Sequence, residues 1–92
     1  MRAIECARFR IHGRVQGVFY RASAEARARE LGLRGWVRND DDGSVQVVAC
    51  GTAAQLQAIA EWLAIGPPDA RVESVQRTAE PPGHYANFSV RR

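Results

Sequence analysis

The stretch LRGWVRNDDDGSVQVVAC, residues 33–50, contains two runs with branched and aromatic residues on either side of a polar turn. The runs 33–39 and 44–50 both have the composition of strands. Residues 40–43, DDDG, join them, and Asp and Gly tolerate the backbone angles that a tight turn between antiparallel strands needs. The stretch therefore predicts a β-hairpin near the middle of the chain.

Helical patterns flank this hairpin on both sides. YRASAEARARELG, residues 20–32, is rich in Ala, Arg and Glu and ends at a glycine that can cap a helix. TAAQLQAIAEWLAIGPP, residues 52–68, begins with the capping box of Thr52 and Gln55 and is stopped by a glycine and two prolines. At helical spacing the apolar stripes are Ala24, Ala28 and Leu31 in the first helix and Leu56, Ile59 and Leu63 in the second.

Strand patterns lie at the two ends of the chain. Residues 5–12 alternate, with Ala7, Phe9 and Ile11 on one face and mostly polar side chains on the other. Residues 70–80 and 86–92 predict two less regular strands around the turn PPGH. The resulting order, β-α-β-β-α-β with a short extra C-terminal strand, is that of the ferredoxin-like split βαβ fold.

This order predicts an α+β sandwich in which an antiparallel sheet carries both helices on one face. Because crossover connections are right-handed and leave room for an intervening strand, we expect the first and second strands to run parallel with the third between them. Parallel strands end at the same edge of a sheet, so the loop after Gly13, the end of the second strand at Asn39 and the start of the first helix should lie together. With 92 residues the chain is expected to form a single domain, residues 1–92.

The composition matches a soluble globular protein, with 46% hydrophobic and 25% charged residues. No apolar run approaches the roughly 20 residues that span a bilayer, and the N-terminus lacks the continuous apolar core of an export signal. We therefore expect a cytoplasmic protein with no membrane partner. All thirteen basic residues are arginine, scattered among acidic ones, which favours small anions over nucleic acid as ligands. No unexplained apolar stripe demands a partner, so we expect a monomer.

The two cysteines, Cys6 and Cys50, lack the spacing of a metal clip or a thioredoxin-type redox pair. In the predicted sheet the first and third strands are antiparallel neighbours, and Cys6 begins one while Cys50 ends the other. A register that pairs the two residues places both thiols on the open face, close enough for a disulfide. A reducing cytoplasm favours two free thiols instead, so both states stay open.

The segment GRVQGVFYR, residues 13–21, joins the first strand to the first helix and suits an anion. Gly13 and Gly17 allow tight turns and close approach of the backbone to a ligand, and the free N–H groups at a helix N-terminus favour negative charge. Arg21 supplies a forked cation that can hold two oxygens of one phosphate. The alternative is a plain strand-to-helix turn with solvated arginines, and the loop alone does not decide between the two.

Together with Asn39 inside GWVRNDDDGSVQVVACG, residues 35–51, this segment resembles the two signature motifs of the acylphosphatase family. The order of helices and strands follows that family over nearly the whole chain, and Tyr20 stands where phenylalanine is more usual. The resemblance implies hydrolysis of small acyl phosphates to a carboxylate and inorganic phosphate, without metal or organic cofactor. Arg21 matches the phosphate-binding arginine and Asn39 the asparagine that positions the attacking water. The matching loop, whose main-chain N–H groups hold the phosphoryl oxygens, comprises Val15, Gln16, Gly17, Val18, Phe19 and Tyr20.

The sequence also admits two other functions and a metal site. A non-catalytic module could bind small phosphorylated metabolites in the same pocket, although binding alone would not need Asn39. A ferredoxin-like nucleic-acid-binding domain could use the open sheet face, but the strands lack the paired exposed aromatic residues that such domains stack on bases. The carboxylates of residues 40–42 could ligate a divalent cation, but such residues are common at hairpin tips, so we expect no metal site.

Overall fold

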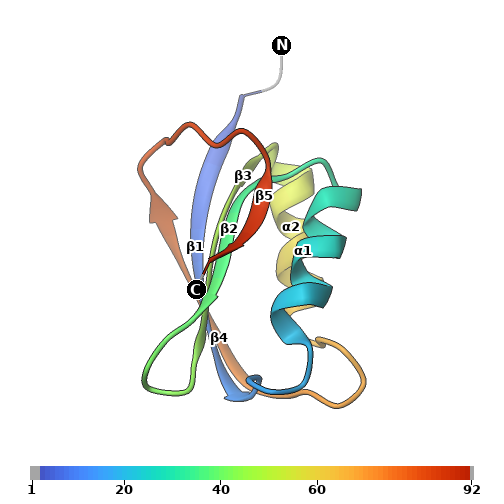
Figure 1. Ribbon diagram of the computed structural model, residues 1–92. Coiled ribbons are helices and arrows are strands. Elements are labelled where there is room, and N and C mark those ends of the chain that lie inside the picture. The colour runs from blue at the N-terminus through green and yellow to red at the C-terminus, as the bar shows by residue number, and fades with distance from the viewer. Residues whose placement is uncertain (1–2, 92) are drawn as a thin grey trace.

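The computed structural model describes residues 3–91, which form one five-stranded sheet and two helices (Figure 1). The order of elements is the predicted one, so the α+β ferredoxin-like fold with an extra C-terminal strand is confirmed. The predicted last strand extends to Arg92, which lies outside the described residues. The elements are β1 (Glu5–Arg14), α1 (Tyr20–Glu30), β2 (Arg34–Asn39), β3 (Val45–Gly51), α2 (Ala53–Leu63), β4 (Arg71–Glu80) and β5 (Phe88–Arg91).

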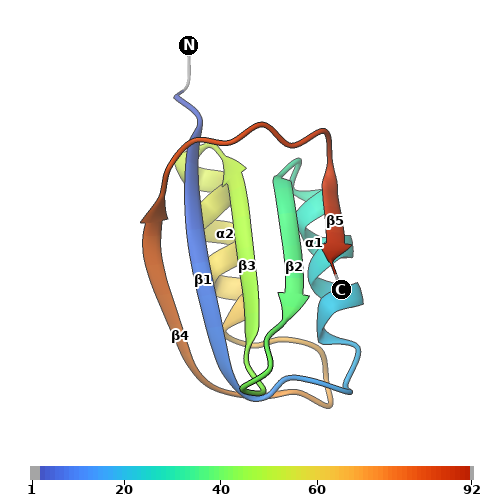
Figure 2. The ribbon, with the colours of Figure 1, turned by 60° about the vertical axis from the view of Figure 1, so that its left-hand side comes forward.

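The strands lie side by side in the order β4-β1-β3-β2-β5. As predicted, β3 lies between β1 and β2 and is antiparallel to both. However, β5 runs parallel to β2, so the sheet is mixed, whereas the sequence predicted an antiparallel one. The reason is the path of residues 81–87, which cross one end of the sheet from β4 to the opposite edge (Figure 2). Strand β5 therefore starts at the end of the sheet where β4 finishes, although the two strands are at opposite edges. It runs antiparallel to β4 and so in the same direction as β2.

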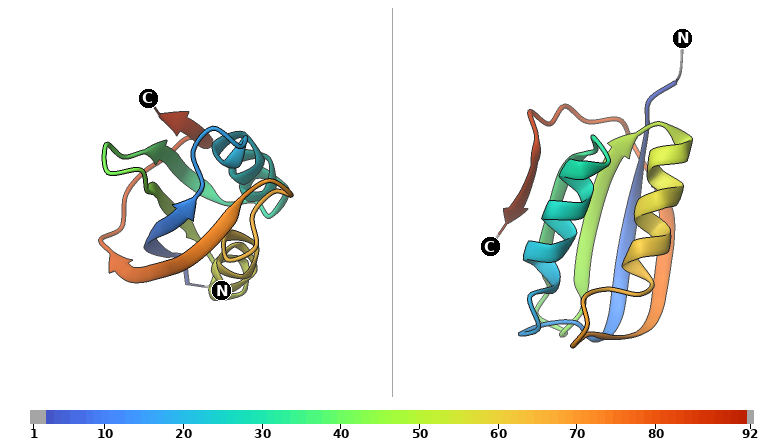
Figure 3. Two further views of the ribbon diagram at one scale, coloured as in Figure 1. Left: turned by 90° about the horizontal axis from the view of Figure 1, so that it is seen from below. Right: turned by 90° about the vertical axis from the view of Figure 1, so that its right-hand side faces the viewer.

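Both helices pack on the same face of the sheet, and the hydrophobic core lies between them and the strands (Figure 3). The predicted stripe of α1 is buried at Ala24 and Ala28, while Leu31, just past the helix end, is only partly buried. Neither helix is long and apolar enough to cross a membrane. The largest fully buried side chains in this core are Phe9, Ile11, Tyr20, Leu56, Ile59, Leu63 and Phe88.

The two helices begin differently. Thr52 caps α2 as predicted: its Oγ1 accepts a hydrogen bond from the Gln55 N–H (3.2 Å), and the Gln55 Oε1 accepts one from the Thr52 N–H (2.8 Å). In contrast, no side chain caps the N-terminus of α1. The first N–H groups of any α-helix have no partner within the helix. In α1 no side chain at the N-cap accepts a hydrogen bond from them either.

The open face of the sheet carries Trp36, which is only 5% exposed. The guanidinium carbons of Arg8, Arg38 and Arg91 lie 5.6, 5.1 and 4.9 Å from its ring centroid. Such distances are typical of cation–π contacts. Trp36 is therefore a packing residue, and its ring is covered rather than presented to a base.

The two cysteines face each other across β1 and β3, in the register that the sequence allowed for a disulfide without deciding it. Their sulfur atoms lie 2.01 Å apart in a disulfide. Cys6 is near the start of β1, and the loop that leads into α1 follows the end of β1. The bridge and that loop therefore lie at opposite ends of the same strand.

Candidate active site

The residues that carry the predicted chemistry lie at one end of the sheet. Strands β1 and β2 end there and α1 begins there, with the β1–α1 loop between them (Figure 1). Arg21 in the first turn of α1 and Asn39 at the end of β2 line the same cavity, whose volume is about 330 Å³. The complete lining is Val15, Gly17, Phe19, Tyr20, Arg21, Ala22, Asn39 and Val90. The fold thus brings the two motifs of the sequence together.

The backbone of the β1–α1 loop has left-handed conformations on either side of Val18. Gly17 has φ 74°, and Phe19 has φ 62° and ψ 24°. Left-handed residues of this kind occur in nests, where successive N–H groups point into one concavity that attracts an anion. Within residues 3–91, Phe19 is the one non-glycine residue with positive φ, so the loop accepts backbone strain at this position.

The start of α1 adds positive charge to the cavity. No acidic residue lies in its first turn, so the partial charge of the uncapped N–H groups is not neutralised locally. Arg21 is half-buried in the same turn, and no carboxylate within the described residues forms an ion pair with it. A helix N-terminus with an unpaired guanidinium is an electrostatic arrangement that favours phosphate.

Asn39 carries an unsatisfied polar atom. In the part of the chain that the structure describes, its Oδ1 is the one buried side-chain nitrogen or oxygen without a hydrogen-bond partner. Leaving such an acceptor unpaired costs about 1–3 kcal/mol, and native structures rarely keep one without a use for it. Because Asn39 lines the cavity that Arg21 also lines, its amide is available to a small molecule bound there.

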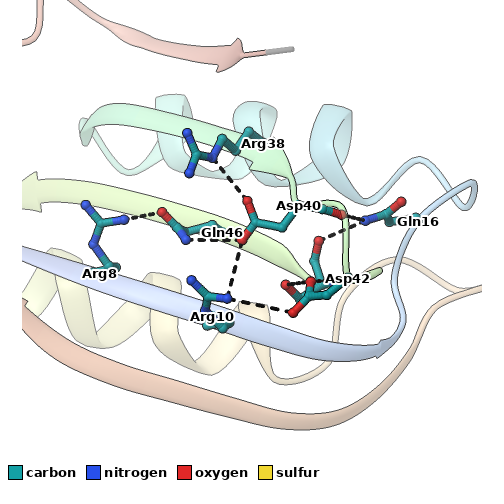
Figure 4. A network of polar contacts seen from close by, with 8 residues as sticks. Arg8, Arg10, Gln16, Arg38, Asp40, Asp42 and Gln46 are labelled. Atoms are coloured by element: carbon teal, nitrogen blue, oxygen red, sulfur yellow. Dashed lines mark hydrogen bonds and ion pairs between the residues drawn. The ribbon is translucent and has the colours of Figure 1, made fainter.

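Gln16 and Val18 do not line the cavity. Val18 is buried, and the side chain of Gln16 points away toward the β2–β3 hairpin (Figure 4). The Gln16 Nε2 donates hydrogen bonds to the backbone oxygens of Asp40 (2.8 Å) and Ser44 (2.9 Å). Gln16 therefore fastens the loop before Arg21 to the turn that follows Asn39. The motif predicted only a backbone role for Gln16, because nothing in the local sequence indicates which segment its amide will meet.

The side chain of Asp40 anchors the same hairpin from the open face of the sheet (Figure 4). Its Oδ1 accepts a hydrogen bond from Arg38 Nε (3.2 Å) and its Oδ2 accepts one from Gln46 Nε2 (3.1 Å). The Arg10 guanidinium lies 3.6 Å from the same Oδ2, and Gln46 in turn accepts a hydrogen bond from Arg8. Asp40, which follows Asn39 in the chain, is therefore held by side chains from three strands, β1, β2 and β3.

Asp42 serves the turn between β2 and β3. Its Oδ1 accepts hydrogen bonds from the Ser44 hydroxyl (2.5 Å) and the Ser44 N–H (2.9 Å). These hydrogen bonds, with the nearby charge of Arg10, hold the pKa of the Asp42 carboxyl below its ordinary value. Within residues 3–91, no cluster of three or more His, Cys, Asp or Glu side chains could hold a metal ion.

Tyr20 borders the cavity with a side chain that is otherwise buried. Its hydroxyl donates a hydrogen bond to the Leu63 backbone oxygen at 2.6 Å, and its ring centroid lies 5.6 Å from that of Trp62. Burial raises the pKa of the phenol, so it stays neutral as a donor. The hydroxyl that distinguishes Tyr20 from phenylalanine therefore ties the start of α1 to the end of α2.

Two lining residues, Ala22 and Val90, were not predicted from the sequence. Ala22 is one residue beyond the motif, and Val90 lies on β5, which reaches the cavity only because that strand pairs with β2. The cysteines lie elsewhere: they line a larger cavity of about 810 Å³ that shares no lining residue with the first. The disulfide is therefore separate from the site of Arg21 and Asn39.

Comparison with known proteins confirms the resemblance from both sequence and structure. The sequence profile of the family described as Acylphosphatase matches residues 7–90. The acylphosphatase of Acidovorax sp. (strain JS42) is 55% identical over 82 residues, which are 89% of this chain and 84% of that protein. An acylphosphatase structure from Coxiella burnetii has a TM-score of 0.92 and 41% identity, covering 96% of this chain and 93% of that chain. The acylphosphatase from Bacillus subtilis also has a TM-score of 0.92, at 32% identity, covering 98% of this chain and 100% of that chain. The chain therefore belongs to the acylphosphatase family, enzymes that hydrolyse acyl phosphates.

Proposed function

We propose that Arg21 and the N–H groups of residues 15–20 hold the phosphoryl group of an acyl phosphate while Asn39 positions the water that attacks it. The observation that carries this proposal is the buried Oδ1 of Asn39, which has no hydrogen-bond partner within residues 3–91, in a cavity that Arg21 also lines, whose guanidinium forms no ion pair within those residues. The first is an acceptor suited to water, and the second is a cation suited to phosphate.

The phosphoryl group is held by charge and by geometry. A guanidinium can donate two parallel hydrogen bonds to two oxygens of one phosphate, which fixes the orientation of the group as well as its position. The left-handed residues Gly17 and Phe19 and the uncapped start of α1 supply backbone donors beside it. These donors stabilise the negative charge that spreads over the phosphoryl oxygens in the transition state.

Asn39 orients water but does not deprotonate it. Its Oδ1 accepts a hydrogen bond from the water and so directs a lone pair of the water oxygen toward phosphorus. An amide is far too weak a base to take the proton. The hydrogen bonds of Gln16 to the following turn keep the loop and Asn39 at a constant separation, which matters because positioning supplies most of the catalysis in phosphoryl transfer.

The reaction exchanges one phosphorus–oxygen bond for another. The water oxygen bonds to phosphorus while the bond from phosphorus to the carboxyl oxygen breaks, and the carboxylate leaves with the electron pair. Its conjugate acid has a pKa of about 4, so the leaving group needs no proton at neutral pH. Because the cavity lining includes no carboxylate, imidazole or thiol, the proton of the water passes to a phosphoryl oxygen. The products are a carboxylate and inorganic phosphate, and no step requires a metal or an organic cofactor.

Hydrolysis of benzoyl phosphate in the presence of a chelator, followed by the loss of ultraviolet absorbance, tests the role of Asn39. We expect Asn39→Ala to lower kcat roughly a hundredfold with a smaller change in KM, since a positioning contact is lost rather than a binding one. The matched control is Asn87→Ala, an exposed asparagine in the loop before β5 that does not line the cavity. An Asn39→Ala enzyme with wild-type kcat and a raised KM would overturn the assignment.

Inhibition by inorganic phosphate tests the role of Arg21. The product should compete with substrate in the wild type, and Arg21→Gln should weaken both phosphate inhibition and kcat/KM by about tenfold or more, because two charge-assisted hydrogen bonds are lost. Arg34→Gln is the control, since Arg34 begins β2 at the end opposite Asn39. Normal phosphate inhibition of a folded Arg21→Gln protein would count against the proposal.

A further inference from the structure

Phe19 is an exposed aromatic residue at a strained backbone position. It is 80% exposed, and its φ of 62° lies in the left-handed region that favours glycine. An exposed phenylalanine gains little from the core, and its Cβ makes the left-handed conformation unfavourable. Glycine would satisfy this position at a lower cost in folding free energy. The ring must therefore contribute something other than stability of the fold.

Phe19 lines the cavity that Arg21 also lines. Two other apolar residues of that lining, Ala22 and Val90, also keep exposed surface, and the three come from the loop, from α1 and from β5. Ala22 is exposed and Val90 is half-buried, so apolar surface of both residues remains open to a ligand. Large apolar side chains that border a cavity without being buried are typical of surfaces that meet an apolar ligand group.

The polar groups of the cavity are already used. In the proposed function Arg21 holds the phosphoryl group and Asn39 holds the water, while the Tyr20 hydroxyl is hydrogen-bonded to the end of α2. Among the described residues that line the cavity there is no second cation and no further side-chain donor or acceptor for a polar acyl group. A second phosphate or an ammonium on the substrate would therefore lose its hydration without gaining a side-chain partner.

We infer that the preferred substrates are acyl phosphates whose acyl group is apolar, above all aromatic, and that this group packs between Phe19 and Val90. The inference rests on the proposed function, because it assumes that the phosphoryl group lies at Arg21. Phe19 is then a residue that determines specificity, acting on the acyl group through its ring while its N–H serves the phosphoryl group.

The test compares kcat/KM for benzoyl phosphate with kcat/KM for acetyl phosphate, expressed as a ratio for each variant. General damage to the loop lowers kcat/KM for both substrates and therefore cancels in the ratio. The intrinsic difference in reactivity between the two leaving groups is the same in every variant and cancels when the ratios are compared. We expect the ratio to fall about tenfold in Phe19→Gly and in Phe19→Asn, since roughly half of a ring's burial is lost. Both residues accept a left-handed backbone, so both variants should fold, and Phe19→Gly should melt no lower than the wild type.

Three further variants separate the ring from other causes. Phe19→Tyr keeps the ring and should keep the wild-type ratio, while Val90→Ala should lower it in the same direction as the loss of Phe19. Ile65→Asn is the matched control, because Ile65 is a similarly exposed apolar residue (73%) that does not line the cavity, and its ratio should not change.

The outcomes distinguish this inference from the proposed function. If the wild type hydrolyses both substrates and the ratio is the same in Phe19→Gly, Phe19→Asn and wild type, the inference about the acyl group is wrong and the proposed function stands. If the wild type hydrolyses neither substrate, the proposed function fails and the inference fails with it. A fall in the ratio that Phe19→Tyr does not show supports the aromatic ring as the determinant.

Discussion

Loss of the Cys6–Cys50 bridge is expected to lower thermal stability substantially. The bridge joins the start of β1 to the end of β3 across a sequence separation of 44 residues. In the chain-entropy treatment, releasing a cross-link of that length stabilises the unfolded chain by about 4 kcal/mol at room temperature. For a domain of this size 1 kcal/mol corresponds to roughly 4–8 °C in Tm. We therefore expect Tm to fall by about 20 °C when the bridge is absent.

Thermal unfolding measured by circular dichroism, with and without reductant, gives the magnitude directly. The double variant Cys6→Ala/Cys50→Ala should melt with the reduced wild type and should not respond to reductant. Intact mass before and after reduction shows whether two hydrogen atoms are gained, which reports the bridge itself. Turnover of benzoyl phosphate at room temperature should be the same in both states, because the cavity beside the cysteines shares no lining residue with the cavity of Arg21 and Asn39.

Two results would refute this reasoning. A wild type whose mass does not change on reduction has free thiols, and the bridge is then not a feature of the protein in solution. If the wild type carries the bridge but its Tm falls by less than about 5 °C on reduction, the pairing of β1 with β3 already restricts the reduced chain in its unfolded state. In that case the estimate from loop entropy is wrong, while the pairing of the two strands is not contradicted.

Three other perturbations test the packing around the site. Tyr20→Phe leaves the buried Leu63 oxygen without its hydrogen bond and should cost about 1–2 kcal/mol in urea denaturation, whereas wild-type stability would contradict that role. Gly35→Ala places a Cβ 1.9 Å from a carbonyl oxygen of β3 at a φ of +141°, so the variant should lose more than about 3 kcal/mol, and a well-folded protein by the same assay would contradict the pairing. The hydrogen bond from Arg8 lowers the pKa of Glu80, so this contact stabilises the fold above the ordinary glutamate pKa of 4.5 and is lost as the pH falls through the lowered value. Glu80→Gln should therefore flatten the decline of Tm below pH 4.5, and an unchanged acid profile would argue against the ion pair.

The order of helices and strands could be predicted from the sequence because it depends on short-range patterns. Alternation in residues 5–12 predicted β1, and the capping box of Thr52 and Gln55 predicted the start of α2. That β1 and β3 are neighbours followed from the handedness of crossovers, which is a general property of L-amino-acid chains, whereas the register that places Cys6 opposite Cys50 was left open. These inferences needed no knowledge of how particular side chains meet.

The direction of β5 was not accessible in this way. The chain from residue 81 to residue 87 carries no signal that it will cross the end of the sheet, and its destination depends on the free edge of β2. Val90 reaches the cavity only as a result of that pairing. The strand was therefore predicted in its place along the chain but not in its place in the sheet.

For the proposed catalytic site, the sequence by itself determined which chemical groups are present, since the guanidinium of Arg21, the amide of Asn39 and the glycine at position 17 are properties of residue types in a recognisable spacing. The tertiary structure alone decided which of these groups remain unpaired. It paired Gln16 with the hairpin and left the Asn39 oxygen buried without a partner. The physical reason is that whether a polar group is satisfied depends on neighbours distant in sequence, and the short-range periodicities that specify helices and strands carry no information about them.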